Sequence, residues 1–233
     1  MFLEKLKEFP KIKTLIIATA LTFIPFILIT ISFIINELAL ESTSGYGILD
    51  LELAWTPDSI NEIFTAWGTD IIKRQIFMHY LDYVYLCIYA LFGVQCVLIT
   101  SRYLNGNLQD LGIKFSIIFV LAGIFDALEN INLLLMLTNQ AFISPLSPFF
   151  ASLCAIIKIS FLVAGLSFLF IAVNILLFKK LRISDKFRYI SLIVGGIIFF
   201  WLISLWNIFL SFFVGGISIL LLILLRWCEK KSF

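Results

Sequence analysis

The sequence has few charged residues and a single histidine. Only 14% of the 233 residues are charged, whereas about a quarter are charged in a typical soluble domain. The net charge of +2 is too small to favour a nucleic-acid partner. Hydrophobic residues make up 61% of the chain instead, which indicates that lipid rather than water surrounds most of its surface.

The sequence also lacks the motifs of common catalytic and cofactor-binding families. It contains no G-x-S-x-G, H-E-x-x-H, P-loop or G-x-G-x-x-G pattern, which does not favour an enzyme. The four cysteines show neither zinc nor redox spacing, so we expect them to be small buried hydrophobic residues. With one His in the chain, we expect no bound metal and no cofactor.

Long apolar runs predict several membrane-spanning helices. About 20 apolar residues cover the hydrocarbon core of a bilayer. The last apolar run, 189–226, is too long for one span and is expected to fold as a hairpin near Asn207. We therefore predict an all-α helix bundle over 1–233 that forms a single transmembrane domain. Its six spans are expected at 14–36, 77–100, 115–137, 149–178, 189–207 and 209–226.

The positions of Lys and Arg predict the orientation of these spans. With six spans, four segments share one side of the membrane and hold 14 of the 17 basic residues. These segments are 1–13, 101–114, 179–188 and 227–233 together with Arg226. The loop between the first two spans is rich in Asp and Glu instead. We expect a multi-pass integral membrane protein with both termini in the cytoplasm.

The loop between spans one and two is expected to form an outer cap over 45–76. Residues 49–55 alternate between apolar and polar, a period of two that predicts a short half-buried strand. Pro57 predicts the start of a helix, and Ser59 with Glu62 offers a competing capping box. Apolar residues at helical spacing then predict an amphipathic helix on the outer membrane surface or over the mouth of the bundle. They are Ile60, Ile63, Phe64, Trp67 and Ile71.

Ionisable side chains inside the predicted spans are the most informative residues. Each costs about 2.5–3.5 kcal/mol at a helix centre by insertion scales, so such groups normally face partners or water. Their spacing of three and four residues places those of one span on a common helix face. Asp82, Glu129 and Lys158 also fall at a similar depth, roughly 8–14 Å below the outer boundary. We predict one polar pocket in the outer half, formed by His79, Asp82, Tyr83, Asp126, Glu129, Asn130 and Lys158.

Several acids beside one Lys are compatible with several functions. Lys158 can neutralise one carboxylate, and the others must share protons, accept hydrogen bonds or hold a cation. The leading hypotheses are a proton relay through Asp82, Asp126 and Glu129, and a pocket whose Lys158 holds a lipid-like or amphiphilic ligand. The alternative is a non-catalytic membrane subunit or scaffold whose buried polar cluster only fixes helix packing. A membrane hydrolase with a metal at His79 is the third possibility.

Two short motifs lie between residues 45 and 135. The first is Leu51-Glu52-Leu53-Ala54, followed by Ala66-Trp67-Gly68 and by Leu81-Asp82 with Tyr89. The second is a D-x-x-E-N pattern in the third span, Asp126-Ala127-Leu128-Glu129-Asn130. Together they resemble a group of small bacterial multi-span membrane proteins that carry no assigned activity. The resemblance implies that Asp82, Asp126, Glu129 and Asn130 belong to one site, and it implies no activity.

Overall fold

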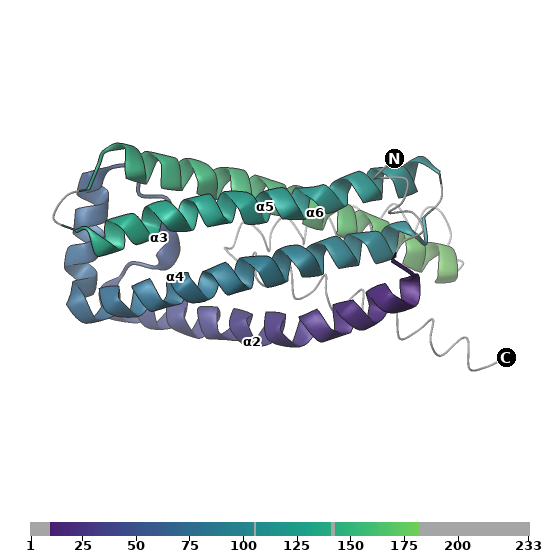
Figure 1. The fold of residues 1–233 in the computed structure, drawn as a ribbon, viewed down its shortest axis with the longest axis horizontal. Helices are drawn as coiled ribbons and strands as arrows, with labels where there is room; N and C mark the ends of the chain where they lie inside the picture. The colour runs from purple at the N-terminus through teal and green to yellow at the C-terminus, as the bar shows by residue number, and fades with distance from the viewer. Residues whose placement is uncertain (1–9, 105, 141–142, 182–233) are drawn as a thin grey trace. The chain divides into compact units, whose positions relative to one another are not determined.

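The secondary structure of the chain is helical throughout the part that the structure describes. The computed structural model describes residues 10–104, 106–140 and 143–181. Its helices are α2 (Ile12–Ser44), α3 (Ile48–Glu52), α4 (Pro57–Ser101), α5 (Asn107–Thr138) and α6 (Leu146–Leu181), drawn in Figure 1. The predicted fifth and sixth spans, 189–207 and 209–226, lie outside the described residues.

Four of these helices are long and apolar enough to cross a membrane: α2, α4, α5, and α6 over Leu146–Leu176. The first four predicted spans each fall within one of them. The helices are longer than the predicted spans. At about 1.5 Å per residue, the 33 residues of α2 extend roughly 50 Å, more than the hydrocarbon thickness of about 30 Å. Their length and composition support an integral, multi-pass membrane protein.

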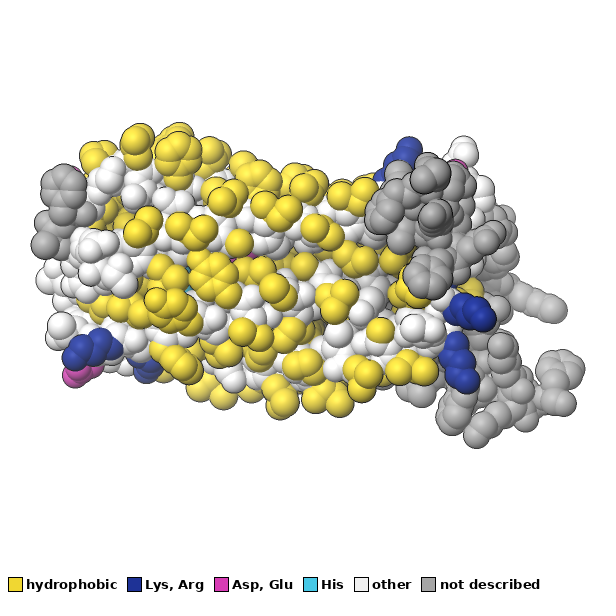
Figure 2. All heavy atoms as spheres, viewed as in Figure 1, with side chains coloured by type: hydrophobic (Ala, Val, Ile, Leu, Met, Phe, Trp, Pro, Cys, Tyr) yellow, Lys and Arg dark blue, Asp and Glu magenta, His cyan; other side chains and the backbone are white. Residues whose placement is uncertain are grey.

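The surface of the long helices is also suited to lipid. Hydrophobic side chains are spread over much of the described face in Figure 2. Along α2, large apolar residues such as Ile24, Leu28 and Ile31 are exposed. An exposed apolar surface of this kind promotes aggregation in water, but lipid tails solvate it well. Hydroxyl groups on the same helix are satisfied internally, because Thr19 and Thr30 each donate to a backbone carbonyl one turn earlier at 2.7 Å.

Internal contacts divide the chain into two compact units, and each long helix contributes residues to both. Unit 1 contains the described residues of Met1–Phe23, Phe92–Phe119 and Leu162–Phe233, and unit 2 is Ile24–Leu91 with Val120–Phe161. In unit 1, a Cβ added at Gly93 or Gly165 would lie 2.2 or 2.6 Å from the ring of Phe119. The two glycines therefore make room for a buried aromatic ring between closely packed helices.

The predicted strand over 49–55 is wrong, because most of that segment forms the helix α3. The Asp50 carboxylate accepts a hydrogen bond from the Gly47 N–H at 2.7 Å and so closes the first turn. Leu51 within the helix is buried, and so is Ala54 in the turn that follows it. A strand would need a neighbouring strand to pair with, and the described part of the chain contains none.

Helix α4 begins at Pro57, as predicted. Thr56 Oγ1 accepts a hydrogen bond from the Ser59 N–H at 3.3 Å, so Thr56 rather than Ser59 caps the helix. Gly68 has φ 66° and ψ 174°, a backbone conformation open essentially only to glycine, and α4 is kinked there. The predicted apolar stripe, which continues past the kink, packs into the core of unit 2. Its buried members are Ile60, Ile63, Phe64 and Trp67, with Ile71 partly buried beside them.

Candidate functional site

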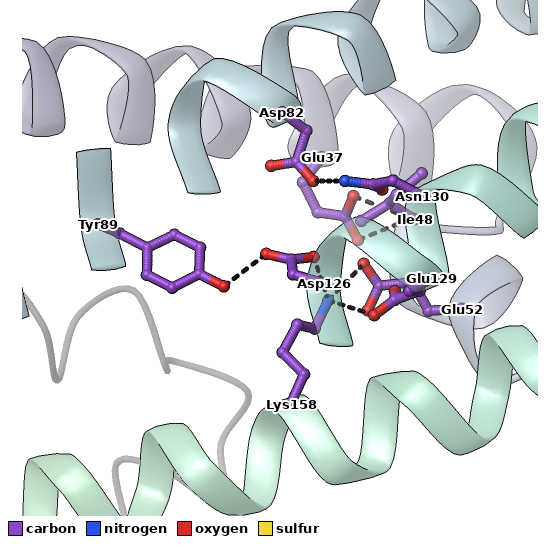
Figure 3. Close-up of polar contacts among 9 residues, drawn as sticks. All are labelled: Glu37, Ile48, Glu52, Asp82, Tyr89, Asp126, Glu129, Asn130 and Lys158. Atoms are coloured by element: carbon purple, nitrogen blue, oxygen red, sulfur yellow. Dashed lines mark hydrogen bonds and ion pairs between the residues drawn. The ribbon is translucent and has the colours of Figure 1, made fainter. Parts of the chain in front are cut away.

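The centre of the candidate site is the ammonium group of Lys158 on α6, within unit 2. Lys158 Nζ lies 2.8 Å from Glu129 Oε2, 3.2 Å from Asp126 Oδ1 and 3.5 Å from Glu52 Oε1 (Figure 3). The two nearer carboxylates come from α5, and Glu52 comes from α3. We call these four residues the Lys158 cluster. The cluster thus joins three helices through one cation.

Helix periodicity explains why α5 supplies two of the carboxylates. Asp126, Glu129 and Asn130 are three or four residues apart, so they share one helix face. All three are buried, and the Glu129 side chain has an exposed fraction of 0%. Ala122 on the same face is also buried, and a small residue there lets the neighbouring helices approach.

Two further polar contacts lie beside the cluster. The hydroxyl of Tyr89 on α4 donates a hydrogen bond of 2.7 Å to Asp126 Oδ2, the oxygen on the opposite side of that carboxylate from Lys158 (Figure 3). Asn130 Nδ2 donates a hydrogen bond of 2.6 Å to Asp82 Oδ2. Asp126 is therefore held by both a cation and a phenol, and Asp82 is held by an amide.

The carboxylates of the site outnumber its cations. Glu52, Asp126 and Glu129 contact the single ammonium of Lys158, and Asp82 lies beside them, bonded to Asn130. If all five groups were ionised, the site would carry a net charge of −3, which is costly among apolar helices. Protons or a further cation must therefore balance part of this charge.

Glu129 has an additional unsatisfied atom. Its Oε1 is buried and has no hydrogen-bond partner among the described residues. An ionised carboxylate needs a donor at that oxygen, and a protonated one needs an acceptor for its O–H. Glu129 Oε1 is thus unsatisfied in either protonation state, which makes it the position where a water molecule or another mobile group would be bound.

Four of the predicted site residues lie outside the Lys158 cluster: Asp82 and Asn130, which bond to each other beside it, and His79 and Tyr83. His79 is buried, and its Nδ1 lies 2.8 Å from the carbonyl oxygen of Gln75 on the same helix. The Gln75 side chain exchanges hydrogen bonds with Asn36. Tyr83 is only partly buried, and the structure gives it no hydrogen bond to the described residues. Within the described ranges, no three His, Cys, Asp or Glu residues are placed to hold a metal ion.

The structure also adds two residues that the sequence analysis did not assign to the site. Glu52 belongs to the loop between the first two spans, so no periodicity within a span relates it to Lys158. Tyr89 is seven residues, or two turns, after Asp82, and this spacing places it on the same face of α4. The spacing from Asp82 could therefore have predicted Tyr89 as a site residue, whereas no spacing in the sequence relates Glu52 to Lys158.

Comparison with known proteins adds no relative. No protein family, no curated protein and no solved structure matches this chain. The resemblance carried by the D-x-x-E-N pattern therefore stays a prediction, and the function has to be argued from the geometry of the cluster.

Proposed function

We propose that this chain is a membrane protein that binds protons at the Lys158 cluster and passes them on. The observation that supports this proposal is the convergence of three carboxylates, those of Glu52, Asp126 and Glu129, on one ammonium. One ammonium offsets one carboxylate. The remaining two are neutralised most simply by protons, because a proton needs no space and the site already contains the groups that bind it.

Because all three carboxylates lie near one ammonium, protons can exchange between them. All three oxygens lie within 3.5 Å of Lys158 Nζ, so any two of them are separated by no more than about 7 Å. One water molecule with two hydrogen bonds of about 2.8 Å bridges gaps of up to about 5.6 Å, and a chain of two water molecules bridges a longer one. The unpartnered Glu129 Oε1 supplies an acceptor for such a water.

The arrangement of Lys158 disfavours the other leading hypothesis, a lipid-like ligand. An anionic headgroup would need a free cation, whereas the Lys158 ammonium already lies within 3.5 Å of three carboxylate oxygens. A headgroup at the same place would also have to displace these carboxylates from the ammonium. We therefore favour protons over an anionic amphiphile.

The proposal includes the membrane topology expected from the sequence. We propose six spans with both termini in the cytoplasm, which puts α3 and the Lys158 cluster nearer the outer face. Reporter fusions after Asn207 and at Phe233 test this topology. An outer reporter signal at Asn207 and a cytoplasmic one at Phe233 are expected, and the same side for both would overturn the six-span arrangement.

Infrared spectroscopy of the purified protein in lipid tests proton binding directly, because protonated carboxyl groups have their own carbonyl band. We expect a protonated-carboxyl band that changes with pH and that loses intensity in both Asp126→Asn and Glu129→Gln. Glu41→Gln, the same substitution at an exposed glutamate, is the matched control and should leave the band unchanged. A wild-type spectrum without a pH-dependent band sensitive to Asp126 and Glu129 would refute proton binding.

Proton passage needs a second measurement on the same variants. In sealed liposomes with an imposed membrane potential, the wild-type protein should acidify or alkalinise the lumen, as reported by an enclosed pH-sensitive dye. Glu129→Gln should reduce the rate at least tenfold, and Glu41→Gln should retain it. Equal rates for the wild type and for Glu129→Gln would show that the cluster does not carry protons across.

One observation favours a second candidate, a purely structural role. The Lys158 ammonium ties α3, α5 and α6 together, as a packing element would. If the role is structural, Asp126→Asn, Glu129→Gln and Lys158→Met should all lose correct assembly, seen as a loss of the monodisperse peak in size-exclusion chromatography. Correct assembly with altered infrared bands or proton flux would support the proton-binding role.

A further inference from the structure

The members of the Lys158 cluster differ in their access to solvent. The exposed fraction of the side chain falls from 17% for Glu52 through 11% for Lys158 and 6% for Asp126 to 0% for Glu129. Glu52 also has the longest contact with Lys158 Nζ, at 3.5 Å. Solvent therefore reaches the cluster at Glu52 first and at Glu129 last.

Glu52 owes its position to contacts that do not involve the cluster. The Glu37 carboxylate on α2 accepts hydrogen bonds from the Ile48 N–H, the first amide of α3, at 2.9 and 3.0 Å (Figure 3). Just before α3, Trp67 Nε1 donates to the carbonyl oxygen of Tyr46 at 3.2 Å. The Tyr46 hydroxyl donates to Glu62 at 2.6 Å, and this hydrogen bond raises the pKa of Tyr46.

Packing fixes α3 as well. Leu51, the residue before Glu52, is buried in the same apolar core as Ile60 and Trp67. The helix is thus held by hydrogen bonds at its start and by a buried leucine near its end. Neutralising Glu52 weakens its contact with Lys158 but should leave α3 in place, because the anchors at Ile48, Tyr46 and Leu51 do not depend on the Glu52 charge.

We infer that Glu52 is the residue through which protons enter and leave the Lys158 cluster, from the side of the membrane on which α3 lies. This inference rests on the proposed proton-binding function. Glu52 takes up a proton from water as its carboxylate becomes a carboxylic acid. The same proton then passes to a carboxylate of α5, Glu52 returns to its ionised form, and Lys158 remains an ammonium throughout. No oxidant, reductant or co-reactant is needed.

A kinetic experiment separates entry of the proton from its binding. The full chain in lipid is subjected to a pH jump, and the protonated-carboxyl band is followed in time by infrared spectroscopy. In Glu52→Gln, we expect the band that depends on Asp126 and Glu129 to remain pH-dependent, with a lower final intensity because Lys158 then offsets one of these two carboxylates. The band should appear at least tenfold more slowly. Glu41 is an exposed acid on the outer end of α2, and the control variant Glu41→Gln should respond at the wild-type rate.

The outcomes distinguish this inference from the proposed function. If Glu52→Gln responds at the wild-type rate while Glu129→Gln loses the band, protons bind but do not enter through Glu52, and the inference is wrong. If the wild type shows no pH-dependent band, the proposed function itself fails.

Glu52→Asp covers the case in which Glu52→Gln does not assemble. It keeps a carboxylate and withdraws it by about one C–C bond length of about 1.5 Å. A response between the wild-type rate and a tenfold reduction supports the inference, and an unchanged rate overturns it. Where both variants assemble, Glu52→Asp should also recover much of the rate lost in Glu52→Gln. A purely structural role for the length of the side chain does not predict this recovery, because Gln keeps the length of Glu and Asp does not.

Discussion

Replacing Lys158 by Met removes the only cation from the cluster while keeping much of the apolar volume of the side chain. At an effective dielectric constant of about 20, two unit charges 2.8 Å apart attract each other by roughly 6 kcal/mol before desolvation is considered. Desolvation offsets much of this attraction in the intact pair. Removing one partner of a buried pair nonetheless costs about 3–5 kcal/mol, because the other charge is left buried without compensation. We therefore expect Lys158→Met to lower the free energy of unfolding by about 3–5 kcal/mol at neutral pH.

The free energy of unfolding can be measured by titrating the protein in mixed micelles with a denaturing detergent and following its helix content. Lys73→Met is the matched control, because Lys73 is exposed on α4 and should change stability by less than about 0.5 kcal/mol. Adding Glu129→Gln to Lys158→Met should restore part of the loss, since the charge left without a partner is then gone. Lowering the pH should reduce the difference in free energy of unfolding between Lys158→Met and the wild type, because protonation also removes the charge left without a partner.

Two results would contradict this reasoning. A stability of Lys158→Met within about 0.5 kcal/mol of the wild type at neutral pH would mean that the ion pairs contribute little net stability. A double variant as unstable as the sum of both single variants would mean that Lys158 and Glu129 do not interact energetically.

Three further substitutions test the packing around the cluster and the kink, each by the same detergent titration. Gly68→Ala should cost about 1–3 kcal/mol, because alanine is strained at φ 66° and ψ 174°; an unchanged stability would argue against the kink. Tyr89→Phe should cost about 0.6–1.7 kcal/mol through loss of the hydrogen bond to Asp126, and additivity with Asp126→Asn would refute that contact. Gly93→Ala should cost about 1–3 kcal/mol, because its Cβ would overlap the Phe119 ring, and Phe119→Leu should relieve part of this cost.

Helix periodicity alone predicted much of the candidate site. Asp126 and Glu129 share a face of one helix at a spacing of three residues, and Lys158 falls at a matching depth on another helix. Because helix rise and rotation per residue are nearly constant, residue spacing alone predicts both the face and the depth of a side chain. The structure brings these three residues into contact.

Periodicity did not predict which polar groups of α4 would meet the cluster. His79 was grouped with the acids, but its ring bonds to the Gln75 carbonyl, whereas Tyr89 two turns beyond Asp82 bonds to Asp126. A helix face is wide enough to hold several polar side chains. The tilt and rotation of the neighbouring helices decide which of them come within hydrogen-bonding distance, and these depend on packing throughout unit 2.

The amino-acid sequence by itself indicated several helices long and apolar enough to span a membrane, and it predicted acids and a lysine at similar depths within them. Hydropathy and helical spacing are local properties, so both follow from short stretches of chain. Only the tertiary structure decided that residues 48–52 form a helix and that Glu52 reaches Lys158, 106 residues further along the chain. Leucine alternation favoured a strand there, and it was outweighed by the Gly47–Asp50 hydrogen bond, the anchor on Glu37 and the burial of Leu51. Contacts between segments so distant in sequence arise from packing of the whole unit, which no local pattern encodes.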